Sequence, residues 1–324
     1  MQHISSSSPQ SLRFTRERGE GSGDRTFAAI GAASAGLLIL ILVGVAACVV
    51  DLALPSIRAF GASFVTTSVW DPVHSIFGGL AFVWGTLLTS VVALTLAIPI
   101  GLGVAVFQTD LGPRRLQRHV GRIVELLAAI PSVVYGLWAA LALAPILRTS
   151  IEPGLEATLG FLPLFRGPKL GVGILCAALI LAIMLLPTVA SVTREVLRSV
   201  PSELREGGLA LGATRWDVVR HIVFPHAKGG IFGAILLSFG RAIGETMAVA
   251  MVVGSRAEIA TSLFAPGYTM ASVIANEFPV ATSELHIAAL AEVGLLLFVV
   301  TLAFNAAARA LIGRRFTAKN EEVA

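Results

Sequence analysis

Charged residues are scarce in this chain of 324 residues: only 14% are Asp, Glu, Lys or Arg, whereas 55% are hydrophobic. A soluble domain of average composition has about 25% charged residues, which cover its surface. The composition therefore excludes disordered and fibrous proteins and argues against a soluble enzyme. It favours an all-α membrane protein with several spanning helices.

Residues typical of catalysis or metal binding are also few. Cys48 and Cys176 lie inside apolar runs and form no CxxC pair, and the histidines show no metal-ligand spacing. The chain has no GxxxxGK[ST] motif for binding nucleotide phosphates. We therefore predict no catalytic residue, no metal site and no cofactor bound by this chain. The net charge of +4 is attributed to basic loops beside a lipid membrane, with no nucleic-acid partner.

Six apolar runs are long enough to cross a bilayer, which takes roughly 20 residues in a helix. They cover residues 27–50, 80–107, 124–146, 171–190, 229–254 and 287–312. Six such runs in one chain argue against buried helices of a soluble protein. The first run exceeds the apolar region of a signal peptide, so we interpret it as an uncleaved span.

Basic residues are distributed unequally between the two sides of these spans. With the N-terminus inside, 18 Lys and Arg residues fall on the cytoplasmic side and 5 on the other, while Arg241 lies within a span. Because cytoplasmic loops are enriched in Lys and Arg, both termini are predicted to be cytoplasmic. The expected location is the inner or plasma membrane of a bacterial cell.

These patterns divide the chain into four parts. Residues 1–26 form a polar leader expected to be disordered, and residues 27–76 form the first spanning helix with its extracytoplasmic loop. Residues 77–312 form the main membrane region, which contains a long cytoplasmic loop at 191–228, and residues 313–324 form a cytoplasmic tail.

The loop at 191–228 is patterned as two short amphipathic helices around a glycine turn. Ser202 is expected to cap the first helix, Gly212 to end it and Thr214 to cap the second. Pro225 is expected to end the pattern. One interpretation is a pair of helices that only anchor the bundle at the membrane surface. The other is a docking element for a cytoplasmic partner.

The residue spacing in this loop resembles the EAA loop of type I ABC-importer permeases. Glu206-Gly207-Gly208 is followed by three residues, Gly212, nine residues and then Ile222 to Pro225. The family has two alanines where this chain has Gly207 and Gly208. The resemblance implies a coupling helix that fits a cleft in a nucleotide-binding subunit, with Glu206 as the acidic contact and Gly212 as the turn.

The fifth apolar run carries two charges, Arg241 and Glu245. A charge at the bilayer centre costs about 2.5–3.5 kcal/mol even on a lenient scale. In a continuous helix the spacing of four would place both side chains on one face, with Ser238 near the same stripe. Two interpretations stay open: an ion pair that locks helix packing, and a polar lining of a translocation path. An arginine suits a tetrahedral oxyanion, since it donates paired hydrogen bonds and keeps its charge.

The string GRAIGETMAVAMVVG at 240–254 resembles the fifth span of the PstC family, the permease subunits of phosphate ABC importers. The strings at 125–139 and 85–107 are also similar to that family and to type I permeases generally. This resemblance implies three kinds of partner besides membrane lipid: a second permease (PstA-like), an ATPase dimer (PstB-like) that binds ATP and Mg²⁺, and an extracytoplasmic phosphate-binding protein (PstS-like). It implies a subunit that forms half of the phosphate pathway.

Other functions remain as alternatives. A permease of the same architecture could carry sulfate or molybdate. A secondary transporter driven by an ion gradient is disfavoured by the coupling-loop spacing, and a membrane scaffold or sensor is the third class.

Overall fold

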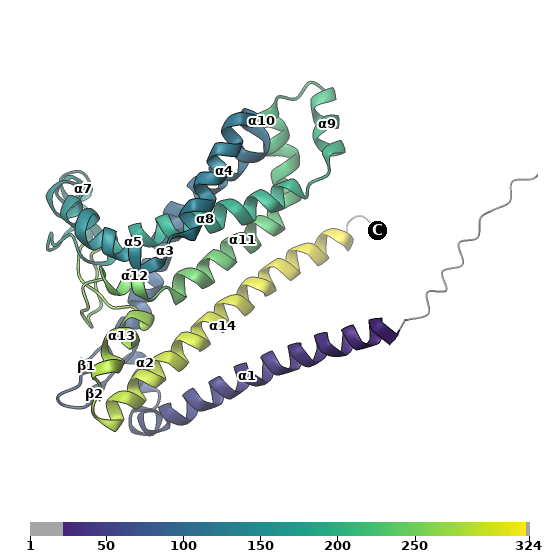
Figure 1. Ribbon diagram of the computed structural model, residues 1–324. Helices are drawn as coiled ribbons and strands as arrows, with labels where there is room; N and C mark the ends of the chain where they lie inside the picture. The colour runs from purple at the N-terminus through teal and green to yellow at the C-terminus, as the bar shows by residue number, and fades with distance from the viewer. Residues whose placement is uncertain (1–21, 322–324) are drawn as a thin grey trace, which may run out of the picture. The chain divides into compact units, whose positions relative to one another are not determined.

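The computed structural model describes the backbone of residues 22–321 and the side chains of residues 26–307, 309 and 310. Most of the predicted leader therefore lies outside the described residues. The chain divides into two units, residues 1–48 and 49–324. The first unit contains most of helix α1 (Ser22–Phe60), and all the other elements belong to the second (Figure 1).

The elements follow one another as a series of helices with one short hairpin. After α1 come α2 (Ser63–Thr66), β1 (Trp70–Asp71), β2 (Ile76–Phe77), α3 (Leu80–Val106), η1 (Phe107–Leu111), α4 (Arg114–Ala129), α5 (Ser132–Trp138), η2 (Ala139–Leu143), α6 (Ala144–Ile146), η3 (Leu147–Ile151), α7 (Glu152–Leu159) and η4 (Pro163–Phe165). The second half contains α8 (Ile174–Arg198), α9 (Ser202–Ala210), α10 (Arg215–Val218), η5 (Val219–Val223), α11 (Phe224–Gly244), α12 (Met247–Ala250), α13 (Met270–Glu277), η6 (Phe278–Val280) and α14 (Glu284–Glu321).

In the part of the chain that the structure describes, six helical segments are long and apolar enough to cross a membrane, which confirms the predicted number. They are Thr26–Phe60, Leu80–Leu111, Ser132–Leu159, Ile174–Arg198, Arg215–Gly244 and Glu284–Ala307. The first, second, fourth and sixth begin within three residues of the predicted positions, and the first, second and fourth continue farther along the chain than predicted.

The third span differs from the prediction of 124–146. Helix α4 ends at Ala129, where Ile130 and Pro131 adopt extended backbone angles. The spanning segment begins only at Ser132. The physical reason is that a residue preceding proline is disfavoured in the α region, so the helix ends there. Glu125 therefore belongs to α4 and lies before the span.

The fifth span also differs from the prediction of 229–254. It begins earlier, at Arg215, and ends at Gly244, and α12 follows as a separate short helix. The bond pattern of the π-helical turn η5 passes directly into α11, so that 215–244 is one helical segment. Pro225 lies in the first turn of α11 and does not end the pattern, because a proline is tolerated at a helix start, where its missing N–H is not needed.

Helix α8 forms the centre of the second unit. It packs along α3, α11 and α4, and its apolar side chains are buried around most of its circumference, including Ile180, Leu181 and Leu185. The hydrophobic core continues through Phe82 on α3 and Phe264 in the α12–α13 loop. In Figure 1 the hairpin of β1 and β2 lies at the opposite end of this unit from α9 and α10.

Candidate functional site

The predicted coupling loop folds as a helix–turn–helix at one end of α8. Helix α9 ends in a turn at Gly212, whose φ of 87° is in the left-handed region that favours glycine. The amide of Ala213 donates to the Gly208 carbonyl at 3.2 Å. The sequence prediction of a glycine turn between two short helices is confirmed.

A capping box begins the second short helix, α10. The Thr214 hydroxyl accepts a hydrogen bond from the Asp217 amide at 3.2 Å, and the Asp217 carboxylate accepts one from the Thr214 amide at 3.1 Å. This arrangement satisfies two backbone donors that the helix itself cannot satisfy. The predicted cap at Thr214 is thus confirmed. Ser202 is the first helical residue of α9 instead of its cap, and Pro201 takes the cap position without a side-chain bond.

The two glycines of the Glu206-Gly207-Gly208 triplet have different surroundings. A Cβ atom at Gly208 would lie 2.6 Å from Ile222 Cδ1 and 3.0 Å from Val218 Cγ2, whereas nothing lies within 4 Å of one at Gly207. Gly208 is therefore the contact point where α9 packs closely against α10 and η5. Ile222, predicted only from its family position, supplies one side of that contact.

Arg205 anchors the same helix to the membrane bundle. Its guanidinium forms an ion pair with Asp110 in η1 and donates a hydrogen bond of 2.5 Å to the Leu197 carbonyl in α8. The Arg205 and Asp110 side chains are only 19% and 10% exposed. Burial lowers the pKa of Arg205, but an arginine starts so high that it stays charged at neutral pH. Sequence reasoning missed this pair, because the partners are far apart in the chain and neither belongs to a motif.

The outer surface of the helix–turn–helix is unusually apolar for an exposed segment. Leu211 is 90% exposed at the turn, and Leu204, Leu209 and Trp216 are also exposed. Glu206 is exposed beside them. A rigid amphipathic helix with large exposed apolar side chains is suited to insertion into a groove of a partner.

Arg241 and Glu245 do not share a helical face, which corrects the predicted arrangement. Arg241 lies in the last turn of α11, but Glu245 follows the helix with an extended ψ of 122°. Glu245 Oε1 instead accepts a hydrogen bond of 3.4 Å from the Ala248 amide at the start of α12. Among the described residues Arg241 has no ion-pair or hydrogen-bond partner. The packing-lock interpretation through this pair is therefore not supported by the geometry.

Ser238 lies three residues before Arg241 in the same helix but differs from it in burial. Its side chain is fully buried, and its hydroxyl donates to the Ala234 carbonyl one turn earlier at 2.9 Å. The donor of this hydroxyl is thus used within its own helix. Arg241, in contrast, is exposed. The predicted polar stripe of Ser238, Arg241 and Glu245 is thus wrong as a single surface: Ser238 is buried, Arg241 is exposed, and α11 ends at Gly244, before Glu245.

Glu292 is a further acidic residue within a span. It is buried in α14, and its Oε2 atom has no hydrogen-bond partner among the described residues. Buried carboxylates inside a membrane segment are rare and usually relate to function. The structure thus places this carboxylate in the protein interior.

The chain matches the model of a known family of membrane transport proteins. Residues 97–317 match the family described as binding-protein-dependent transport system inner membrane component. The matched segment includes the coupling helix–turn–helix and both charged residues of the interrupted fifth span. The chain belongs to this family.

Individual relatives narrow the class to one transport system. The chain is 44% identical to "Phosphate transport system permease protein PstC" of Mesorhizobium japonicum, over 90% of each chain. It is 43% identical to the PstC protein of Haemophilus influenzae, over 81% of this chain and 85% of the relative. The PstC 2 protein of Mycobacterium tuberculosis is 40% identical, over 90% and 92%.

Solved structures agree on the fold. An inward-facing form of the MetNI methionine ABC transporter matches with a TM-score of 0.56 at 20% identity, over 76% of this chain and 99% of that chain. A bacterial alginate ABC transporter in complex with its periplasmic protein matches with a TM-score of 0.59 at 14% identity, over 91% and 99%. This chain therefore has the type I ABC-importer permease fold and is a multi-pass inner membrane protein.

Proposed function

We propose that this chain is the permease subunit of an ATP-driven importer of inorganic phosphate and forms half of its translocation pathway. The supporting observation is the identity of 40–44% over most of the chain with phosphate transport permeases named PstC. The predicted termini are cytoplasmic, which puts the helix–turn–helix of α9 and α10 on the cytoplasmic side.

The partners follow from this assignment. A second, PstA-like permease completes the pathway, and a PstS-like binding protein delivers phosphate from outside. A PstB-like ATPase dimer binds ATP and Mg²⁺ and receives α9 in a surface groove. The exposed Leu211, Trp216 and Glu206 support this docking, because they combine apolar anchors with one charge on a rigid segment.

Coupling depends on how firmly α9 is held to the bundle. Arg205 connects α9 both to Asp110, at the end of the second span, and to the Leu197 carbonyl in the fourth. The close contact of Gly208 with Ile222 ties α9 to the segment that continues into the fifth span. Movement imposed on α9 by the ATPases would therefore reach three spans directly.

Arg241 is the residue we assign to the phosphate path. An exposed, unpaired arginine in an apolar span is too costly to face lipid, so its surface must face a partner subunit or water. The helix break between Gly244 and Met247 also supports a position away from lipid, since irregular backbone at membrane depth occurs only within protein or beside a water-filled cavity. The Arg241 guanidinium would donate paired hydrogen bonds to the oxyanion.

The test is ATP-driven uptake of radiolabelled phosphate by proteoliposomes that contain this chain with its candidate partner permease, ATPase and binding protein. Uptake that requires ATP and persists in excess sulfate is expected. An assembled complex that hydrolyses ATP and moves sulfate or molybdate instead would assign the other oxyanion. A chain that recruits no ATPase would contradict the coupling assignment itself.

A further inference from the structure

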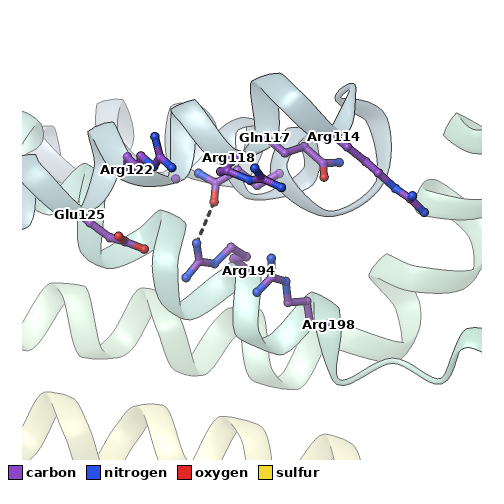
Figure 2. A pocket seen from close by; sticks show the side chains of 9 residues that line it. Arg114, Gln117, Arg118, Arg122, Glu125, Arg194 and Arg198 are labelled. Atoms are coloured by element: carbon purple, nitrogen blue, oxygen red, sulfur yellow. Dashed lines mark hydrogen bonds between the residues drawn. The ribbon is translucent and has the colours of Figure 1, made fainter.

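A second group of arginines surrounds a cavity that the proposed transport path does not use. The cavity has a volume of about 500 Å³ and lies between α4 and the last turns of α8. Its lining includes Arg114, Arg118 and Arg122 from α4, Arg194 and Arg198 from α8, and Gln108 from η1. Figure 2 shows the arginines of the two helices on opposite sides of this space.

The charges around this cavity are strongly unbalanced. Arg114, Arg118 and Arg122 repeat every four residues and so lie on one face of α4, and Arg194 and Arg198 repeat in the same way on α8. The lining contains a single carboxylate, from Glu125. Glu195 pairs with Arg194 at 3.3 Å and with Arg198 at 3.8 Å, but its side chain is largely exposed. Facing rows of like charge repel one another unless an anion lies between them.

Gln108 supplies an observation that is independent of charge. It is 4% exposed, and its Oε1 atom accepts a hydrogen bond of 3.2 Å from Arg194 Nη1. This bond fixes the amide orientation, because the opposite orientation would place two donors against each other. The Nε2 group of Gln108 and the Nε group of Arg194 then have no hydrogen-bond partner among the described residues. Both residues line the cavity, and buried donors need an acceptor.

We propose that this cavity binds a phosphate group, either free inorganic phosphate or the headgroup of an anionic phospholipid. Arginine forks match the tetrahedral oxygens of phosphate, and the Gln108 amide adds a neutral donor. Free phosphate is a candidate because it is the proposed transported ion. A phospholipid is a candidate because α4 exposes Leu116, Ile123 and Leu126, which form an apolar surface for acyl chains.

This site is distinct from the proposed path at Arg241. Arg241 lies 17 positions after Phe224, so about 25 Å farther along α11, whereas the cavity adjoins the coupling segment. A neighbouring cavity shares Gln108, Gln117 and Arg198 with it and is also lined by Ser202 and Arg205 at the start of α9. A bound phosphate group would therefore join α4 to the α8 end from which the coupling helix follows.

The experiment measures binding to the intact complex in lipid nanodiscs, without ATP and without the binding protein. One arm uses nanodiscs of phosphatidylcholine and radiolabelled inorganic phosphate. The other uses nanodiscs enriched in phosphatidylglycerol and counts retained lipid by native mass spectrometry. Arg118→Gln, Arg194→Gln and Arg115→Gln are compared, since Arg115 is an exposed arginine of the same helix outside the cavity lining.

Arg118→Gln and Arg194→Gln are expected to weaken binding at least about tenfold, either of inorganic phosphate in the first arm or of phosphatidylglycerol in the second. This is the effect of losing a hydrogen bond to a charged group. Arg115→Gln should leave that affinity unchanged, and Glu125→Gln should increase it. The arm that responds identifies the source. The proposal is overturned if neither phosphate nor phosphatidylglycerol shows binding that depends on Arg118 or Arg194, or if Arg115→Gln weakens binding as much as Arg118→Gln. Arg118 is exposed, so its variant tests binding even if Arg194→Gln fails to fold. Because no uptake is measured, an error in the transported ion would not alter the result.

Discussion

Arg205 and Arg241 are two arginines of one chain with opposite surroundings. Arg205 is mostly buried, paired with Asp110 and bonded to a carbonyl, whereas Arg241 is exposed and has no partner among the described residues. A fully satisfied charge fixes the position of a structural element, and an unsatisfied one is available to a ligand. The difference separates a segment built to transmit movement from a segment built to contact the transported ion.

The largest effect is expected from Arg241→Ala. We expect phosphate uptake to fall by at least about a hundredfold, because the charged donor to the oxyanion is lost, while assembly and ATP hydrolysis persist. Uptake in proteoliposomes and the purified subunit ratio measure the two quantities. Arg256→Ala is the matched control, since Arg256 is an exposed arginine paired with Glu258 outside the helices. A variant that fails to assemble would show that Arg241 serves packing.

Breaking the ion pair between Arg205 and Asp110 should uncouple phosphate transport from ATP hydrolysis. Arg205→Met or Asp110→Asn alone leaves one mostly buried charge without its partner, which typically costs about 3 kcal/mol. The double variant should be less destabilised than the sum of the two single variants. The readouts are phosphate moved per ATP hydrolysed and amide hydrogen exchange of residues 202–218. Additive single effects would indicate that the two side chains do not act as a pair.

The two glycines of α9 provide a finer test of how firmly the coupling helix is held. Gly208→Val should cost about 2 kcal/mol in local stability, because its Cβ atom alone would lie 2.6 Å from Ile222 Cδ1 and 3.0 Å from Val218 Cγ2. Gly207→Val should stay within about 0.5 kcal/mol, as the space beside Gly207 is open. Hydrogen exchange of α9 measures both. Equal effects would contradict the packing of α9 through Gly208.

The smallest effect is expected at the cap of α10. Thr214→Ala removes the capping-box acceptor and should cost about 1 kcal/mol in the opening free energy of α10. Thr158→Ala is the control, because its hydroxyl donates only to carbonyls of its own helix. Protection of the Asp217 amide from exchange is the measurement, and unchanged protection would show that the cap does not hold the turn.

Local patterns predicted the coupling segment well. The positive φ at Gly212 and the cap at Thr214 follow from residue types whose preferences act within a few residues. The fifth span was predicted less well. Its start differs from the prediction because Pro225 lies in the first turn of α11 and does not end a helix, and its interruption after Gly244 has no proline to mark it.

The sequence by itself determined the six spans, the membrane class and the family, because apolar length and fixed motif spacing are properties of the linear chain. Only the tertiary structure decided which charges are satisfied. The Arg205–Asp110 pair, the lack of a partner for Arg241 among the described residues, and the arginines facing each other across the α4–α8 cavity depend on how distant helices pack. A side chain's electrostatic state is set by what lies within a few ångströms of it, and spacing along the chain does not record that distance.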